Sequence, residues 1–345
     1  MQRAITHLSM GLALLLAGFA TLGLAQNQVK GSWGKANTKG APAVAIDQNG
    51  TKYVAWNKSG SNQILVATSP ADSKTWTLLG ISEGGAGVVG GTDWTAGTNL
   101  APALSFDSNT NQIWLAFKGQ SIPTDGILVS QWTGSSWTNQ EAVSTSAGKP
   151  LTGYAPALSG GSGISLAWKG ASTSNDDIWT TSWTGSEWAP QAKVEGTTWT
   201  AGSSTTPAWT QTFLQVGVSP NLIWKGGSPN LWWTAGSGTA WNEQQQIHCE
   251  DPVWTAQTIA APAATENNNG YSADVVFWTT SSFSIEYTYT DGSGCGWAPP
   301  ETVRSAKTEI GPAATLAPNF SYFLLAWTKT NGQVWYTTFD QVPMP

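Results

Sequence analysis

The sequence predicts an all-β fold: a single six-bladed β-propeller built from four-stranded antiparallel blades. One segment, residues 154–188, contains three short apolar runs joined by turns and a tryptophan that opens a fourth run, the content of one propeller blade. The same pattern recurs six times along the chain. No segment shows the sustained 3.6-residue period of a helix, so the prediction contains strands alone.

The repeats align at one kind of position for each strand. The first strand begins at a proline that recurs at similar intervals: Pro42, Pro102, Pro156, Pro207, Pro262 and Pro312. The second strand carries an aromatic residue: Trp56, Phe117, Trp168, Trp224, Trp278 and Trp327. The third strand carries an aliphatic residue: Ile64, Ile127, Ile178, Leu231, Ile285 and Val334. The fourth strand opens on a tryptophan in five repeats: Trp76, Trp137, Trp188, Trp241 and Trp297.

The sixth repeat has no fourth strand, because the chain reaches residues 341–345 first. At the other end of the chain, Trp33 precedes Pro42 as the fourth-strand tryptophans precede the later prolines. We therefore expect an N-terminal strand at Trp33 to complete the last blade and close the ring. Closure removes the exposed sheet edges that promote aggregation.

The segment 1–25 has the features of a signal peptide. Arg3 supplies positive charge, an apolar run follows, and small residues end it near Ala25. An uncleaved membrane anchor is the alternative. We expect residues 26–345 to form the propeller, exported to the periplasm or the extracellular space, with no membrane span after the signal peptide.

The charge and the cysteines limit the function further. The formal net charge is −6 and basic residues are sparse, so nucleic acid is not an expected partner. In an exported chain, Cys249 and Cys295 predict a disulfide between neighbouring blades, with two free thiols as the alternative. Only His248 remains as a histidine beyond the signal segment, and we expect neither a metal site nor a cofactor.

Aromatic, basic and acidic residues recur in the connections on one face of the predicted ring. We expect Trp94 to approach Lys118, Tyr154 to approach Lys169, and Trp199 to approach Lys225. An indole or phenol ring beside an ammonium and a carboxylate suits a sugar, which has apolar faces and many hydroxyls. The predicted ligand-binding residues are Trp94, Asp93, Lys118, Asp125, Tyr154, Lys169, Asp177, Trp199, Lys225 and Trp254.

The best predicted cleft lies between blades one and two, where the connections are longest. It would use Trp94, Asp93, Lys118 and Asp125, and a copy between blades three and four would use Trp199 and Lys225. Structural roles are the alternative: the loop tryptophans could plug the blade junctions, and the lysines could extend to solvent. We assign Trp168, Trp188 and their equivalents to packing between blades.

The repeat at 155–188 resembles the tryptophan-rich repeats of bacterial and fungal β-propeller lectins and of sialidase-like propellers that lack catalytic residues. This resemblance covers nearly all of residues 26–345, and it implies a propeller that binds carbohydrate. Thr184 stands where the Asp-box turn of sialidases has aspartate. Sialidases hold their substrate with three arginines, whereas this chain has only Arg3 and Arg304. Six-bladed fucose lectins use arginine too, so no site residue is transferred from either family.

The predicted function is a secreted, lectin-like protein with several sugar sites between its blades and no catalysis. A glycoside hydrolase or polysaccharide lyase is one alternative, which two carboxylates converging in one pocket would favour. An extracellular protein-interaction, adhesion or structural scaffold is the other, which a flat exposed aromatic patch would favour.

Overall fold

A computed structural model describes residues 25–82, 85–119, 126–171, 176–210, 220–268, 272–291, 296–318 and 322–340. The signal-peptide prediction therefore falls outside the described residues except at Ala25, and so do Asp125 and Cys295. The described residues form strands, turns and loops, and they include no helix that could span a membrane.

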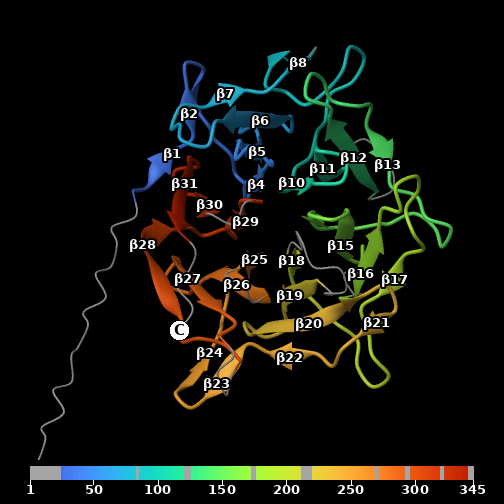
Figure 1. The fold of residues 1–345 in the computed structure, drawn as a ribbon, viewed down its shortest axis with the longest axis vertical. Helices are drawn as coiled ribbons and strands as arrows, with labels where there is room; N and C mark the ends of the chain where they lie inside the picture. Colours follow the sequence, from blue (N-terminus) through green and yellow to red (C-terminus); the bar gives the residue numbers. More distant parts are fainter. Residues whose placement is uncertain are drawn as a thin grey trace, which may run out of the picture.

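Six antiparallel sheets surround one axis, which confirms the predicted six-bladed propeller (Figure 1). Blade one contains β4 (Ala43–Ile46), β5 (Lys52–Asn57), β6 (Ile64–Ser69) and β7 (Thr77–Leu78). Blade two contains β10 (Ala103–Asp107), β11 (Gln112–Lys118), β12 (Ile127–Trp132) and β13 (Glu141–Ala142). Blade three contains β14 (Ala157–Ser159), β15 (Ser165–Lys169), β16 (Ile178–Ser182) and β17 (Ala192–Lys193).

The remaining blades vary in their outer strands. Blade four contains β18 (Ala208–Trp209), β19 (Asn221–Lys225), β20 (Leu231–Ser237), β21 (Ala240–Trp241) and β22 (Gln245–Gln246). Blade five contains β25 (Ala263–Asn268), β26 (Ser272–Thr279), β27 (Ser284–Tyr289) and β28 (Glu301–Lys307). Blade six contains β29 (Ala313–Leu316), β30 (Tyr322–Thr328), β31 (Val334–Asp340) and β1 (Asn27–Gln28). The first strands contact one another around the ring, from β4 through β10, β14, β18 and β25 to β29 and back to β4.

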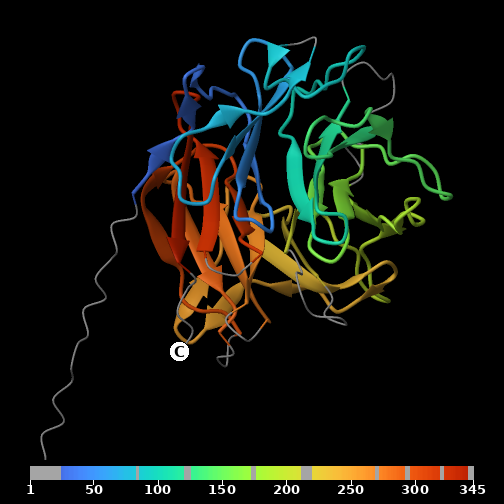
Figure 2. The same ribbon diagram turned by 45° about the horizontal axis from the view of Figure 1, so that its top comes forward.

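The outer strand of blade six comes from the N-terminal region. Strand β1 pairs antiparallel with β31, with Asn27 opposite Tyr336 and Gln28 opposite Trp335. Figure 2 shows this blue segment beside the red C-terminal strands. Our placement of Trp33 in this strand was wrong, because Trp33 lies in the turn between β2 (Lys30–Gly31) and β3 (Gly34–Lys35).

The aromatic residue of each second strand is buried against the preceding blade, as predicted. Each of the six has at most 1% of its surface exposed. Trp168 of blade three packs with Ile127 and Val129 of blade two. Trp224 of blade four packs with Ile178 and Val194 of blade three. One large side chain per blade thus forms the centre of each interface.

A hydroxyl residue four positions before each first-strand proline fixes the connection between blades. The six residues are Thr38, Thr98, Thr152, Ser203, Thr258 and Thr308. Each is at most 1% exposed, and each hydroxyl oxygen accepts a hydrogen bond from the backbone N–H two residues later. Three of the hydroxyls also donate to the backbone carbonyl at the end of the next blade's second strand, as when Thr308 Oγ1 donates to Thr328 O at 2.8 Å. Sequence analysis missed this threonine-proline spacing.

Replacing the aromatic residue at one interface should weaken the whole ring. We expect Trp168→Ala to lower the free energy of unfolding by about 3–5 kcal/mol, because it removes a fully buried indole and leaves a cavity. Urea denaturation followed by circular dichroism measures the change. A loss below about 1 kcal/mol would contradict the central packing role of Trp168.

Removing one connecting hydroxyl should cost less but still be measurable. Thr308→Val keeps the shape of the side chain but leaves the Ile310 N–H and the Thr328 carbonyl without this partner. We expect the free energy of unfolding to fall by about 1–3 kcal/mol. Thr133→Val is the matched control, since the Thr133 hydroxyl makes the same kind of turn bond at an exposed position. Equal losses in both variants would show that burial of the hydroxyl is unimportant.

Candidate functional site

Four of the connections between blades contain the same tryptophan hairpin. The hairpins span residues 29–36, 89–96, 194–201 and 247–256. Each begins at a fully buried valine or isoleucine and ends at a fully buried alanine, and the alanine N–H donates to the carbonyl of the first residue at 2.8–3.0 Å. The alanine carbonyl then accepts from the first residue of the same blade's third strand. Trp33, Trp94, Trp199 and Trp254 therefore occupy equivalent places.

In three of the hairpins the tryptophan lies close to the next blade around the ring. The contact is near the start of that blade's outermost strand. Trp33 Nε1 donates to Trp76 O of blade one at 3.2 Å. Trp94 Nε1 donates to Asn139 Oδ1 of blade two at 3.1 Å. Trp254 packs with the cluster that contains Trp297 of blade five, and its Nε1 is buried. In these three hairpins the tryptophan contacts the neighbouring blade or the core at the junction. This agrees with the alternative that the loop tryptophans fill the junctions between blades.

At the junction between blades three and four, blade four lacks a packing residue that blades two and three have. Trp132 and Trp183 lie at the ends of the third strands of blades two and three, and each covers the tryptophan five residues later, with ring centroids 5.6 and 5.5 Å apart. Gly236 occupies this position in blade four. Its φ is +155°, and a Cβ there would lie 2.3 Å from the Ala240 carbonyl oxygen, so only glycine fits. Trp241 is half-buried, whereas its four equivalents are buried.

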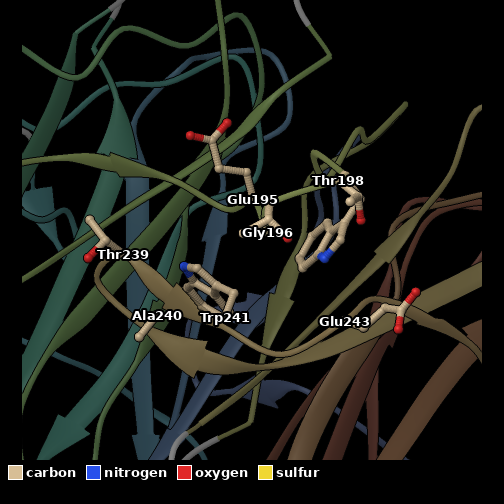
Figure 3. A pocket seen from close by; sticks show the side chains of 9 residues that line it. Glu195, Gly196, Thr198, Thr239, Ala240, Trp241 and Glu243 are labelled. Carbon is tan, nitrogen blue, oxygen red and sulfur yellow. The ribbon is translucent and has the colours of Figure 1, made fainter.

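A pocket of about 480 Å³ lies at this junction. Its lining residues are Glu195, Gly196, Thr197, Thr198, Trp199, Thr239, Ala240, Trp241 and Glu243. Figure 3 shows the Glu195 side chain coming from the hairpin of blade three, and the Trp241 and Glu243 side chains coming from blade four. The volume lies within the range of small-molecule sites, about 300–1,000 Å³.

Both indole rings of the pocket are held by the surrounding chain. Trp241 Nε1 donates to Gly238 O at 2.9 Å, and the Trp209 ring lies 5.9 Å from the Trp241 ring. Trp199 lies against Gly196, where an added Cβ would come within 2.2 Å of Trp199 Nε1. No described residue accepts a hydrogen bond from Trp199 Nε1, in contrast to Trp33 and Trp94. The rings are thus fixed in place while one indole N–H stays available to a ligand.

The expected approach of Tyr154 to Lys169 is present. Lys169 Nζ donates to Tyr154 Oη at 3.2 Å, lies 4.3 Å from the centre of the ring, and pairs with Asp176 at 2.7 Å. Burial alone would lower the pKa of Lys169, but the hydrogen bonds to Asp176 and Tyr154 outweigh it and raise that pKa. The Lys169 side chain is only 4% exposed, so its charge is already compensated within the protein.

The other predicted residues have varied environments. Lys225 Nζ donates to Ser204 Oγ at 2.9 Å, and Trp199 faces the pocket with Trp241. Asp177 pairs with Lys193 at 2.7 Å, Lys118 ends β11, and Asp93 is exposed at its hairpin tip. Asp125 lies outside the described residues. Cys249 is disulfide-bonded, and its pairing with Cys295 stays a prediction because Cys295 is not among the described residues.

Of the residues that line this pocket, the sequence analysis proposed Trp199 as a ligand-binding residue but did not propose Trp241, Glu195 or Glu243. Trp241 was assigned to packing because it aligns with Trp137 and Trp188, which are buried. The signal was present in the repeat itself, where Gly236 replaces the tryptophan of blades two and three.

No protein-family model matches the sequence, and no curated protein matches it. Solved structures share its fold. A variant of the lectin of Aleuria aurantia, in complex with Fucα1-6GlcNAc, has a TM-score of 0.62 at 14% identity, covering 88% of this chain and 95% of that one. A protein of unknown function from Dyadobacter fermentans has a TM-score of 0.63 at 12% identity, covering 93% and 100%. The Hadza microbial sialidase Hz136 has a TM-score of 0.60 at 11% identity, covering 88% of this chain and 66% of that one.

A second polar cluster is buried between blades four and five, away from the pocket. Asp274 and Glu266 face each other across β25 and β26, and Asn221 Nδ2 of blade four donates to Asp274 Oδ2. Burial raises the pKa of Asp274 to about 7; the Asn221 hydrogen bond opposes the shift, and the nearby Glu266 adds to it.

This buried aspartate should make stability depend on pH. The pKa of Asp274 is higher in the folded chain than in the unfolded chain, so the folded chain holds this proton more tightly. The free energy of unfolding should therefore fall as pH rises from about 4 to 7, by up to about 1.4 kcal/mol per pH unit. The free energy of unfolding of Asp274→Asn, relative to that of the original protein, should rise by at least about 1 kcal/mol as the pH is raised from 5 to 8.

Urea unfolding of both proteins at the two pH values measures this difference. Asp93→Asn, at an exposed position, is the control and should show no such gain. A stability difference between Asp274→Asn and the original protein that does not change with pH would contradict the assignment.

Proposed function

We propose that this protein is a carbohydrate-binding propeller, and that its sugar site is the pocket between blades three and four. The observation that carries the proposal is the pair of fixed indole rings, Trp199 and Trp241, in one pocket with two carboxylates. A pyranose ring has an apolar face that packs on an indole, and its hydroxyls bond to carboxylates and threonine hydroxyls. The pocket provides both kinds of group within a rigid frame, which lowers the entropic cost of binding.

The similarity to the Aleuria aurantia lectin supports this proposal without identifying the sugar. That lectin, described as fucose-specific, shares the six-bladed arrangement. The pocket of this chain contains no arginine, lysine or histidine among its lining residues, so its polar contacts must come from carboxylates, hydroxyls and an indole N–H. We propose glycans as the partner and do not transfer fucose specificity.

We also propose that the protein is exported. The segment 1–25 has the composition of a signal peptide, and the disulfide at Cys249 suits an oxidising compartment. A propeller outside the cell would meet polysaccharide surfaces, where a weak site of about −4 kcal/mol gains strength if several copies bind together.

A glycoside hydrolase is the second candidate, because Glu195 and Glu243 line the same pocket. Such an enzyme needs one carboxyl protonated as the general acid, which proteins usually achieve by burial. Both glutamates here are exposed. Binding without cleavage is therefore the function that the pocket supports better.

The test compares equivalent tryptophans from two hairpins. Trp199→Ala should weaken binding to a responsive oligosaccharide from a glycan array at least about tenfold, because it removes one wall of the pocket. Trp94→Ala is the matched control and should bind within about twofold of the original protein, since Trp94 is engaged with Asn139.

Isothermal titration calorimetry measures the affinities, and circular dichroism verifies folding. If both folded variants bind like the original protein, the sugar site lies elsewhere. If the bound oligosaccharide is shortened during incubation, the hydrolase alternative replaces the lectin proposal.

A further inference from the structure

The pocket between blades three and four is acidic. Two of its nine lining residues carry charge, Glu195 and Glu243, and both charges are negative. Only 10% of the residues of the whole chain are charged, so two carboxylates with no cation among the other lining residues make the pocket locally negative. They come from different blades and lie on different sides of the pocket (Figure 3).

Neither carboxylate is neutralised by a direct partner. Among the described residues, Glu195 and Glu243 form no ion pair and no side-chain hydrogen bond. Lys193 is close enough to Glu195 for the two charges to interact, but its ammonium is bound 2.7 Å from Asp177 Oδ2. Lys225, which the sequence analysis placed beside Trp199, donates to Ser204 Oγ. The pocket thus keeps two anionic acceptors for a ligand.

The indole rings add a second attraction for positive charge. The face of a tryptophan attracts an ammonium group by about 0.5–2 kcal/mol, and this attraction adds to a charge-assisted hydrogen bond to carboxylate. The chain already uses this combination elsewhere, where Lys193 lies 5.5 Å from the centre of the Trp179 ring and pairs with Asp177. In the pocket the rings and the carboxylates are present, but none of the lining residues supplies a cation.

We propose that the preferred ligand of this pocket is a cationic amino sugar, a pyranose with a free ammonium group. The inference rests on the proposed function and names its ligand class. The sugar ring would pack on Trp199 or Trp241, while an ammonium group pairs with Glu195 or Glu243. An N-acetylated sugar lacks the charge, and sialic or uronic acids would be repelled by both carboxylates.

The experiment compares three hexamers of similar shape at about pH 5, where the amines of the chitosan hexamer are largely protonated. The chitosan hexamer carries free ammonium groups, the chitin hexamer is fully N-acetylated, and the cellulose hexamer is neutral. We expect calorimetry to show at least about tenfold tighter binding of the chitosan hexamer. Raising the salt from about 50 to 500 mM should weaken that binding several-fold, because exposed charges are screened.

Variants then assign the effect to the two glutamates. Glu195→Gln and Glu243→Gln should each reduce chitosan-hexamer affinity by about tenfold and leave the neutral hexamer within about twofold. Glu187→Gln is the matched control, an exposed glutamate in the equivalent turn of blade three. Glu187→Gln should leave the affinity for the chitosan hexamer unchanged.

The outcomes separate this inference from the proposed function. If a neutral or N-acetylated hexamer binds as tightly as the chitosan hexamer and Trp199→Ala abolishes its binding, the sugar site stands and the amino-sugar inference is wrong. If trilysine binds as tightly as the chitosan hexamer, the pocket recognises charge alone, which also overturns it. Unchanged chitosan binding in both glutamine variants would overturn it as well. If no oligosaccharide binds, the proposed function itself fails.

Discussion

The packing of one aromatic side chain from each second strand against the preceding blade is the interaction on which this structure depends. Each blade is a small twisted sheet that cannot bury its faces alone, so each interface needs two blades and the series is stable as a ring. Trp56, Trp168, Trp224, Trp278, Trp327 and Phe117 fill these interfaces almost completely. Because the interfaces carry the stability, the perimeter can vary from blade to blade, and function is expected there.

The connections between blades differ around the perimeter of the ring. The buried threonine or serine before each proline fixes every connection, and in four connections a tryptophan hairpin directed toward the next blade precedes this residue. At two junctions the hairpin tryptophan is hydrogen-bonded to that blade, and at a third Trp254 packs partly buried against the core. At the fourth, Trp199 and Trp241 are both partly buried, and Gly236 leaves Trp241 without the indole that covers its equivalents in blades two and three. A pocket lies at this junction.

The fold was predictable from the sequence because the buried positions recur in each repeat. The same apolar residues appear wherever a blade meets its neighbour. Trp33 was misplaced because a hairpin tryptophan and a fourth-strand tryptophan both precede a proline, and spacing does not distinguish them. The site was only half predictable. Trp199 follows from its loop position, but the half-buried state of Trp241 could not be read from a repeat in which its four equivalents are buried. Two of the lysines expected to contact sugar are instead engaged by local partners, Asp176 and Ser204.

The lysines and the glutamates near the pocket differ in whether their charges have partners, and this difference makes the pocket negative. In this chain the cations near the predicted clefts are compensated: Lys169 by Asp176 and Tyr154, and Lys193 by Asp177. A compensated cation adds rigidity but offers little to a ligand, since displacing it would leave its carboxylate partner unpaired. Glu195 and Glu243 are the reverse case, exposed anions beside fixed aromatic faces. A site that retains unpaired anions and aromatic rings selects its ligand by positive charge as much as by shape.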